Sequence, residues 1–350
     1  MAQNANIFIP DISGYTEFLT RTELEHSSHI LNELLRILVD SNCSDLTLLE
    51  IEGDALLFYK KGAPLSFDQM VRQCVEMYRS FHTRLRIIER DSVCQCGACR
   101  TASNLTLKFV VHYGEISEIS VASFVKAAGI NMVIAHRLLK NRIDSHEYIL
   151  ATEDYCTMLP DHASIPRFSW KSGSEEYPAV GTITFRYALL DQIRASVSVT
   201  DRPPVSVTLT GDRLSVEINK PMAEVYRAIT DLENRSKWVH GLKRSEGTDP
   251  LDRLHSVHYC HFDDSSVEIV PLEREVSSSR VRYVESGGPA GTDRKTIFAF
   301  ELTPKTGQTT VVTAQIGSPS ADAMPDEAVG PMLERLSGSM ESLKLYLEGQ

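Results

Sequence analysis

The sequence predicts an α+β protein with two domains, an α/β sandwich followed by a unit of strands that a long helix closes. Three observations support this prediction. The chain has 350 residues, which is sufficient for two domains of ordinary size. Apolar strands alternate with amphipathic helices in its first half. In its second half, a run of short strands precedes a final leucine stripe of helical spacing.

The first half places its elements around tight turns. Glu52-Gly53-Asp54 separates two strands in the manner of a hairpin, and Ser13-Gly14 follows the first strand. We expect strands at residues 6–10, 46–51, 55–59, 105–111 and 148–151, and helices at residues 30–39, 67–90 and 131–139. Helices that cover a sheet in this alternation make an α/β sandwich.

The character of the sequence changes near residue 190. Residues 194–206 carry Ser, Thr and the pair Pro203-Pro204, so we expect a linker there between domains at residues 1–193 and 207–350. We expect strands at residues 214–218, 256–262, 267–271, 280–284, 296–302 and 309–315, one helix that opens at Pro221, and a last helix at residues 332–347.

Charge and cysteine usage exclude several classes of protein. Lysine and arginine number 36, aspartate and glutamate 47, and the net charge of −11 argues against an extended nucleic-acid-binding surface. No run of about 20 apolar residues could span a membrane, and the N-terminus does not resemble a signal peptide. Seven cysteines, three of them between residues 94 and 99, do not resemble a secreted disulfide framework. We therefore expect a reduced, cytoplasmic protein.

Two carboxylates carry the strongest chemical signal. Asp11 ends the first strand directly before the turn at residues 12–16, and Asp54 lies in the Gly53-Asp54 hairpin. If these strands are neighbours in one sheet, both carboxylates emerge at the same edge, where they would suit Mg²⁺ or Mn²⁺. The turn would offer backbone N–H groups to a polyphosphate. The alternative is that Asp11 caps a helix and Asp54 occupies an ordinary turn.

Four motifs resemble those of class III nucleotidyl cyclases and follow the family's order along residues 11–138. They are Asp11-Ile12-Ser13-Gly14-Tyr15-Thr16-Glu17-Phe18, Glu50-Ile51-Glu52-Gly53-Asp54-Ala55, Val110-Val111-His112-Tyr113-Gly114-Glu115 and the stretch from Gly129 to Leu138. The resemblance implies a ferredoxin-like α/β sandwich, in which the third motif is a strand that ends in a His-x-Gly turn. It also implies conversion of a nucleoside triphosphate to a 3′,5′-cyclic nucleotide and pyrophosphate.

The resemblance gives a role to each matching residue. Asp11 and Asp54 would hold two Mg²⁺ or Mn²⁺ ions, and Arg137 would stabilise the charge that develops at the α-phosphate. The nucleotide would contact Ile12, Ser13, Gly14, Tyr15, Thr16, Glu50 and Lys126. In the family, the aspartates and the arginine of each site come from different subunits, so we expect a head-to-tail homodimer.

Some positions depart from the family pattern. Val133 stands where the family has an asparagine that binds the ribose, and Asn131 lies on a different side of the helix. Glu50 occupies the base-selecting position that accompanies guanine, but its partner Lys126 matches neither common pattern. The alternative to an active cyclase is therefore a catalytically degenerate homologue that binds nucleotide, senses a ligand or serves as a dimerisation scaffold.

Three closely spaced thiols, Cys94, Cys96 and Cys99, resemble half of a zinc knuckle. A fourth ligand is required, and the sequence offers Cys74, His82 and His112 as candidates. The alternatives to zinc are a redox sensor, because clustered exposed thiols oxidise readily, and cysteines without a functional role.

From Leu214 onward, the pattern resembles the START-like (SRPBCC, polyketide-cyclase-like) helix-grip fold, with Trp238 as its sharpest landmark. The resemblance implies an antiparallel sheet wrapped on the long C-terminal helix, with an apolar small molecule bound between them. A filled core without a ligand is the alternative. We also expect that ligand binding alters the dimer and so regulates the first domain. A ligand that changes neither dimerisation nor turnover would contradict this hypothesis.

Two further points concern the second half. A third functional hypothesis makes this domain an enzyme that acts on a polyketide-like substrate. His258 and Cys260 share one face of a strand, whereas His261 lies on the other, so we assign no metal site to this domain.

Overall fold

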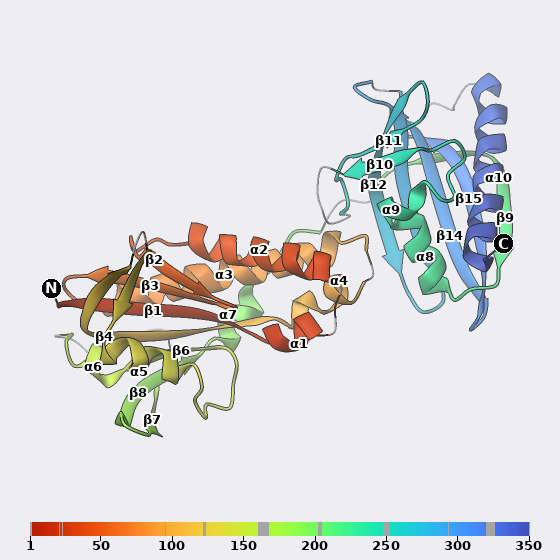
Figure 1. Cartoon of the computed structure of the whole chain (residues 1–350). Helices are drawn as coiled ribbons and strands as arrows, with labels where there is room; N and C mark the ends of the chain where they lie inside the picture. The colour runs from red at the N-terminus through yellow and green to blue at the C-terminus, as the bar shows by residue number, and fades with distance from the viewer. Residues whose placement is uncertain are drawn as a thin grey trace. The chain divides into compact units, whose positions relative to one another are not determined.

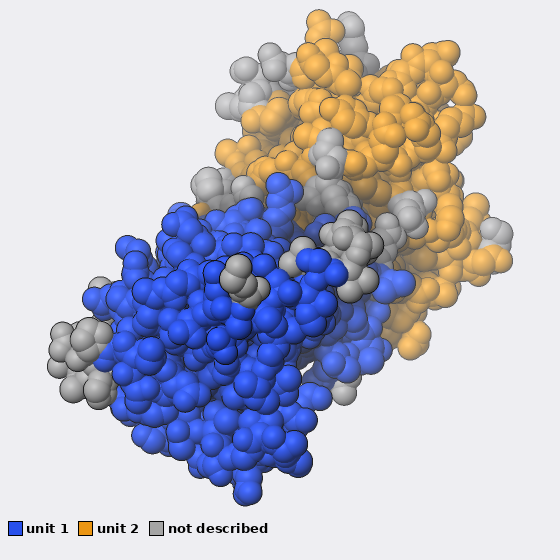
Figure 2. Space-filling model, turned by 60° about the vertical axis from the view of Figure 1, so that its left-hand side comes forward, with its two compact units in different colours: residues 1–89, 100–200 blue, residues 90–99, 201–350 orange. Residues whose placement is uncertain are grey.

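The computed structural model divides the chain into two compact units. It describes residues 2–20, 22, 24–94, 96–121, 124–159, 168–201, 205–247, 253–292, 294–319 and 326–349. Unit 1 comprises residues 1–89 and 100–200, and unit 2 comprises residues 90–99 and 201–350 (Figures 1 and 2). Each unit has its own sheet, and the α+β class expected from the sequence is confirmed. Within the described ranges, no helix combines the length and apolar character that a membrane crossing requires.

Unit 1 is built on a sheet in which β2, β3, β1 and β4 have ferredoxin-like order. Its strands are β1 (Gln3–Ser13), β2 (Thr47–Glu52), β3 (Ala55–Lys61), β4 (Thr106–Val121), β5 (Phe124–Ala128), β6 (Tyr148–Thr152), β7 (Lys171–Tyr177) and β8 (Gly181–Leu189). They lie in the order β2-β3-β1-β4-β6-β8-β7, and β5 pairs with β4. β1 is antiparallel to both β3 and β4, so each helical crossover is a split β-α-β unit.

Helices cover both faces of this sheet and confirm the sandwich. The helices of the first 200 residues are α1 (Tyr15–Thr20), α2 (Leu24–Asp40), α3 (Phe67–Asp91), α4 (Gly97–Thr101), the 3₁₀ helix Ala102–Asn104, α5 (Ile130–Leu138), α6 (Glu153–Cys156) and α7 (Asp191–Ser196). Ile7 and Ile9 of β1 share a buried cluster with Ala135 and Leu138 of α5. Phe8 points to the opposite face, along which α2 and α3 run (Figure 1).

The prediction that β4 ends in a His-x-Gly turn is wrong. β4 continues through His112 and Gly114 to Val121, with Ala5 of β1 opposite Gly114. A glycine is required there because a Cβ atom would overlap the side chain of Asn131. The glycine therefore marks a close approach of α5 to the sheet and not the end of the strand.

Two other differences concern elements that lack an apolar pattern. α2 begins at Leu24 rather than at residue 30, because its first turns are polar and show no stripe. The hairpin of β7 and β8 was not expected, since β7 reads Lys-Ser-Gly-Ser-Glu-Glu-Tyr and lies at the edge of the sheet. Most of its side chains face solvent, so no alternation of apolar residues is needed.

Unit 2 contains an antiparallel meander in the order β10-β11-β12-β13-β14-β15-β9. Its strands are β9 (Thr208–Ile218), β10 (Arg244–Gly247), β11 (His258–His261), β12 (Ser266–Val276), β13 (Val281–Pro289), β14 (Thr296–Thr306) and β15 (Thr309–Ser318). Its helices are α8 (Met222–Thr230), α9 (Leu232–Arg235) and α10 (Asp326–Glu348). Ile229 of α8 and Leu336, Met340 and Leu343 of α10 share one buried cluster with the strands, which confirms the helix-grip architecture.

A segment from the first half of the chain completes the core of unit 2. Val93 is fully buried in that core, and the Tyr226 hydroxyl donates a hydrogen bond to its carbonyl oxygen at 2.9 Å. The Leu254 N–H donates to the carbonyl oxygen of Asp91 at 2.7 Å. The linker at residues 194–206 stays a prediction, and its residues 202–204 lie outside the described residues.

The core of unit 2 predicts opposite outcomes for two leucines of α10. Leu343 is 0% exposed and Leu345 is 47% exposed. We expect Leu343→Ala to lower the free energy of unfolding by about 2–5 kcal/mol, because it leaves a cavity in a packed core. Leu345→Ala is the matched control and should change it by less than about 0.5 kcal/mol. Denaturant unfolding of the full chain measures both, and equal effects would contradict the packing of α10.

Candidate functional site

The pairing of β1 with β3 brings two carboxylates together. Asp11 lies opposite Ala55, the residue that follows Asp54 in the chain. The Ile12 N–H donates a hydrogen bond to the carbonyl oxygen of Asp54 at 3.1 Å, which fixes the β2–β3 turn against the end of β1. Asp11 belongs to a strand and caps no helix, whereas Asp54 does occupy a turn. The structure therefore places the two aspartates side by side.

The two carboxylates repel each other in a partly buried place. Burial, followed by the negative charge of Asp11, raises the pKa of the Asp54 carboxyl above its usual value of 3.8. Asp11 itself is only 9% exposed. A cation close to such a pair of carboxylates reduces their repulsion and stabilises their charged forms.

The cation that the protein supplies is Lys108, which the sequence reasoning did not identify. Lys108 lies opposite Asp11 in the β1–β4 pairing, and its Nζ is 3.0 Å from Asp11 Oδ2. The same Nζ donates a hydrogen bond to the carbonyl oxygen of Leu139 at 3.0 Å. Its charge lowers the pKa of Asp54 and so partly offsets the repulsion. Only the register of two strands joins residues so far apart in the sequence.

The donor set fits a hard divalent cation. Asp11 and Asp54 offer carboxylate oxygens, the ligands that Mg²⁺ and Mn²⁺ prefer, and they leave coordination positions for water or phosphate. Lys108 already neutralises one of the two carboxylates. A divalent ion at this pair would therefore compete with the ammonium group of Lys108.

The residues after Asp11 turn the chain from β1 into α1. The side chains of Ile12 and Ser13 are buried, whereas Gly14 and Thr16 are exposed and Tyr15 is half-buried. Gly14 has a φ of 89°, which favours glycine, and its carbonyl oxygen accepts a hydrogen bond from the Phe18 N–H at 3.0 Å. The exposed part of this turn is thus Gly14, Tyr15 and Thr16.

Glu50 and Lys126, to which the cyclase resemblance assigns base selection, bind each other. Lys126 Nζ of β5 lies 3.2 Å from a carboxylate oxygen of Glu50 on β2. Lys126 is exposed and Glu50 is half-buried, so the pair lies where a ligand could reach it.

α5 carries Val133 and Arg137, two positions to which the cyclase resemblance assigns a role. Val133 is 43% exposed. The guanidinium carbon of Arg137, which is also exposed, lies 5.8 Å from the centre of the Tyr177 ring. Asn131 is engaged within the fold, since its Nδ2 donates to the Glu115 carbonyl oxygen and its Oδ1 lies 2.9 Å from His112 Nε2.

A second group of residues has the chemistry of a metal site. The ligand atoms of His26, Cys94, Cys96 and Cys99 all lie within 4.8 Å of one another. Hydrogen bonds with the thiols of Cys96 and Cys99, together with burial, raise the pKa of the Cys94 thiol. None of the seven cysteines forms a disulfide.

The three candidates for a fourth ligand have partners elsewhere. Cys74 Sγ lies 3.8 Å from Met70 Sδ, His82 Nε2 lies 3.4 Å from a carboxylate oxygen of Glu147, and His112 is held by Asn131 and Thr152. His26 stands with the thiols instead. No local signal could reveal it, because it belongs to a different helix far from the cysteines in sequence.

Unit 2 holds its polar groups in internal pairs. Arg235 binds both carboxylate oxygens of Glu285, and the Tyr283 hydroxyl donates to Glu285 Oε2 at 2.8 Å. Burial, followed by the charge of Arg235, lowers the pKa of His258 to about 3, so this imidazole is neutral at pH 7. His258 binds Ser256, whereas His261 on the other strand face binds Ser266 and Glu246.

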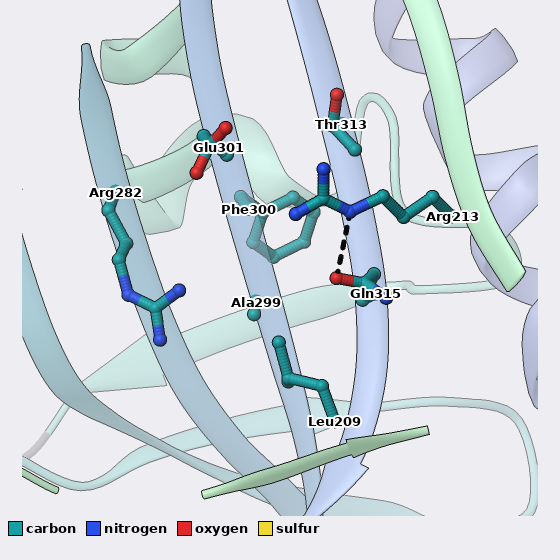
Figure 3. A pocket seen from close by; sticks show the side chains of 8 residues that line it. All are labelled: Leu209, Arg213, Arg282, Ala299, Phe300, Glu301, Thr313 and Gln315. Carbon is teal, nitrogen blue, oxygen red and sulfur yellow. Dashed lines mark hydrogen bonds between the residues drawn. The ribbon is translucent and has the colours of Figure 1, made fainter. Parts of the chain in front are cut away.

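A hollow lies on the face of the unit 2 sheet away from α8 and α10 (Figure 3). It is lined by Leu209, Arg213, Arg282, Ala299, Phe300, Glu301, Thr313 and Gln315. Arg213 Nε donates to Gln315 Oε1 at 3.1 Å, and Arg282 Nε donates to Glu273 at 2.9 Å. Between the sheet and α10, where the helix-grip resemblance implied a ligand, Met340 and Leu343 are buried in the core.

Two family models match the chain, one in each half. Residues 31–148 match the family described as Protein of unknown function (DUF2652). Residues 205–348 match Polyketide cyclase / dehydrase and lipid transport. The C-terminal half contains a START-like domain.

A curated relative matches about a third of the chain. An uncharacterised protein of Mycobacterium tuberculosis is 35% identical over 121 residues, which are 35% of this chain and 56% of that protein. The chain therefore spans little more than half the length of this relative.

Solved cyclase domains are similar to the N-terminal half. The catalytic core of a rhodopsin-guanylyl cyclase with converted specificity, in complex with ATPαS, is 16% identical over 54% of this chain and 98% of its own, with a TM-score of 0.39. The guanylate cyclase domain of RhGC from Catenaria anguillulae, in complex with GTP, is 15% identical over 54% and 97%, with a TM-score of 0.40. A bacterial light-regulated adenylyl cyclase is 13% identical over 56% and 57%, with a TM-score of 0.41.

Because the ammonium group of Lys108 would compete with a metal ion for Asp11, we expect Lys108 to affect the affinity for metal. We expect Lys108→Met to tighten Mn²⁺ binding about tenfold, because it removes a positive charge beside Asp11 while it keeps the apolar stem. Isothermal titration with MnCl₂ measures the affinity. Lys171→Met, which removes an exposed lysine of β7, is the matched control and should leave it unchanged. Weaker binding in Lys108→Met would show that Lys108 organises the pair and does not compete with the ion.

Proposed function

We propose that unit 1 is a metal-dependent nucleotidyl cyclase of the class III type, which converts a nucleoside triphosphate to a 3′,5′-cyclic nucleotide and pyrophosphate. The observation that carries the proposal is the juxtaposition of Asp11 and Asp54 directly before an exposed turn that leads into a helix. The same proposal includes the reduced, cytoplasmic setting inferred from the cysteines.

Each residue of the site has a task in this reaction. Asp11 and Asp54 would hold two Mg²⁺ or Mn²⁺ ions, which supply activation of the ribose 3′-hydroxyl and neutralisation of the triphosphate. The backbone N–H groups of Tyr15 and Thr16 lie in the first turn of α1, and that of Gly14 directly precedes it. N–H groups at the start of a helix have no acceptor within the helix, so they can donate to phosphate oxygens. Lys108, once displaced from Asp11, would be a further cation beside the phosphates.

The base would lie against Glu50 and Lys126. The carboxylate of Glu50 accepts hydrogen bonds and the ammonium group of Lys126 donates them, so together they can match a base edge that offers both an N–H and a carbonyl oxygen. In the protein without ligand the two groups satisfy each other at 3.2 Å. Nucleotide binding would exchange this ion pair for hydrogen bonds to the base.

Arg137 supports a head-to-tail homodimer. Its exposed side chain lies over Tyr177, so within one copy it is directed to the β7–β8 hairpin. In the partner arrangement implied by the family resemblance, Arg137 of one copy would stabilise charge at the α-phosphate bound by the other. Exposed apolar residues on β2, β4 and α5 offer a surface for this contact: Ile51, Ile119, Ile130 and Val133.

The second candidate function is nucleotide binding without turnover. Val133 favours it, because an apolar side chain, 43% exposed, stands where the cyclase family has a ribose-binding asparagine. Asn131 does not replace it, since its amide is bound to His112 and Glu115. In this case unit 1 would act as a sensor or scaffold for dimerisation.

We propose that the START-like domain binds an apolar small molecule and thereby biases the dimer. The family description of residues 205–348 includes lipid transport, which supports an apolar ligand. Since Met340 and Leu343 fill the space under α10, binding would require this helix to move. Saturation with a ligand that changes neither dimerisation nor turnover contradicts the regulatory role.

Turnover distinguishes the two functions. We expect the full chain with Mn²⁺ to form a cyclic product from at least one of the four nucleoside triphosphates, as detected by mass spectrometry. Asp54→Asn should lower the rate at least about 100-fold, because one of two metal carboxylates is lost. Asp144→Asn removes an exposed loop carboxylate and is the matched control. Nucleotide binding without product in the wild-type protein would favour the sensor.

The proposed dimer surface, which includes Ile119, predicts that a charge placed there weakens association. Ile119 is 52% exposed on β4, so Ile119→Glu should leave the fold intact and weaken the dimer at least about tenfold, because a charge would be buried at the contact. Sedimentation velocity measures the association. Met158→Glu, at an apolar residue that is 51% exposed, is the control. A wild-type protein that stays monomeric at high concentration would refute the homodimer.

A further inference from the structure

The group of His26 and three cysteines has the composition of a closed zinc site. Cys94 and Cys96 lie in the loop after α3, Cys99 lies in α4, and His26 lies in the first turns of α2. Their ligand atoms lie within 4.8 Å of one another. Tetrahedral zinc, with Zn–S distances of about 2.3 Å and Zn–N distances of about 2.0–2.1 Å, holds sulfur and nitrogen ligand atoms roughly 3.5–3.8 Å apart. A small contraction of the group would therefore reach the required geometry.

The backbone around the thiols is arranged as for thiolate ligands. The Cys96 N–H points to Cys94 Sγ at 3.4 Å, and the Cys99 N–H points to Cys96 Sγ at 3.4 Å. Hydrogen bonds from N–H groups stabilise a negatively charged sulfur. Cys96 and Cys99 are only 5% and 6% exposed, so three thiolates gathered here would require a cation for compensation.

The donor types select the metal. Three sulfurs and one imidazole nitrogen form a soft set that favours Zn²⁺ over Mg²⁺ or Mn²⁺. Four protein ligands leave no open position, which is the mark of a structural ion and not of a catalytic one. This site is therefore chemically distinct from the oxygen donors Asp11 and Asp54.

We propose that His26, Cys94, Cys96 and Cys99 bind one structural zinc ion. The ion ties the beginning of α2 to the loop between α3 and α4. Because α1 directly precedes α2, the ion also restrains the chain that follows the turn at residues 12–16.

The test measures metal content and does not depend on any cyclase activity. We expect the full chain, purified under reducing conditions without chelators, to contain one zinc per chain by inductively coupled plasma mass spectrometry. After removal of the zinc, Co²⁺ should restore binding and give the sulfur-to-cobalt charge-transfer band and intense d–d bands of a tetrahedral thiolate site. No zinc, combined with no Co²⁺ spectrum in the reduced protein, overturns the proposal.

Variants separate a ligand from a bystander. Cys99→Ala and His26→Ala should weaken zinc binding about 100-fold or more, because each removes one of four ligands. His26→Cys supplies a fourth thiolate and should retain the zinc, with a cobalt spectrum shifted to that of four sulfurs, so a loss in His26→Ala is not simply misfolding. His29→Ala, one turn further along α2, is the matched control and should bind normally. An unchanged affinity and cobalt spectrum in His26→Ala would exclude His26 as the fourth ligand and overturn the proposed ligand set.

Discussion

The candidate site depends on one constraint, the pairing of β1 between β3 and β4. This strand brings Asp11 next to Asp54 on one side and opposite Lys108 on the other. Consecutive residues of β1, such as Ile7 and Phe8, are buried on opposite faces of the sheet. The buried side chain of Asn6 helps to fix the register, because it forms hydrogen bonds with the backbone of Lys60, Ala63 and Leu65. A slip by one residue would exchange these faces and separate the charged groups. The core of unit 1 therefore determines the geometry of its chemistry.

The electrostatics of this candidate site oppose the stability of the fold. Burial and the negative charge of Asp11 disfavour ionisation of Asp54, whose pKa is raised. Lys108 reduces the repulsion with a charge that belongs to the protein. Under the proposed function, a divalent ion would replace the ammonium group of Lys108 at Asp11, and the ammonium group would then contact phosphate. Structural pairs such as Arg235 and Glu285 in unit 2 are instead closed by mutual bonds.

The segment between α3 and α4 links chemistry to packing. Asp91 and Val93 take part in the backbone contacts and core of unit 2, and Cys94 follows immediately. An apolar residue of the core of unit 2 and the first of the three clustered thiols are thus neighbours in the sequence. Val93, which lies between two elements of the first half in the sequence, is therefore part of the core of unit 2.

The sequence by itself determined the elements and their chemical types. Apolar periodicity located most strands and the helices α3, α5 and α10, because alternation and helical stripes arise within a few residues. Spacing around Asp11, Asp54 and the three cysteines identified the types of ligand, since those signals are also local. Tertiary structure alone decided which groups meet. Lys108, His26 and the pairing of Glu50 with Lys126 depend on strand register and on the packing of elements far apart in the chain, and no local pattern of residues encodes those contacts.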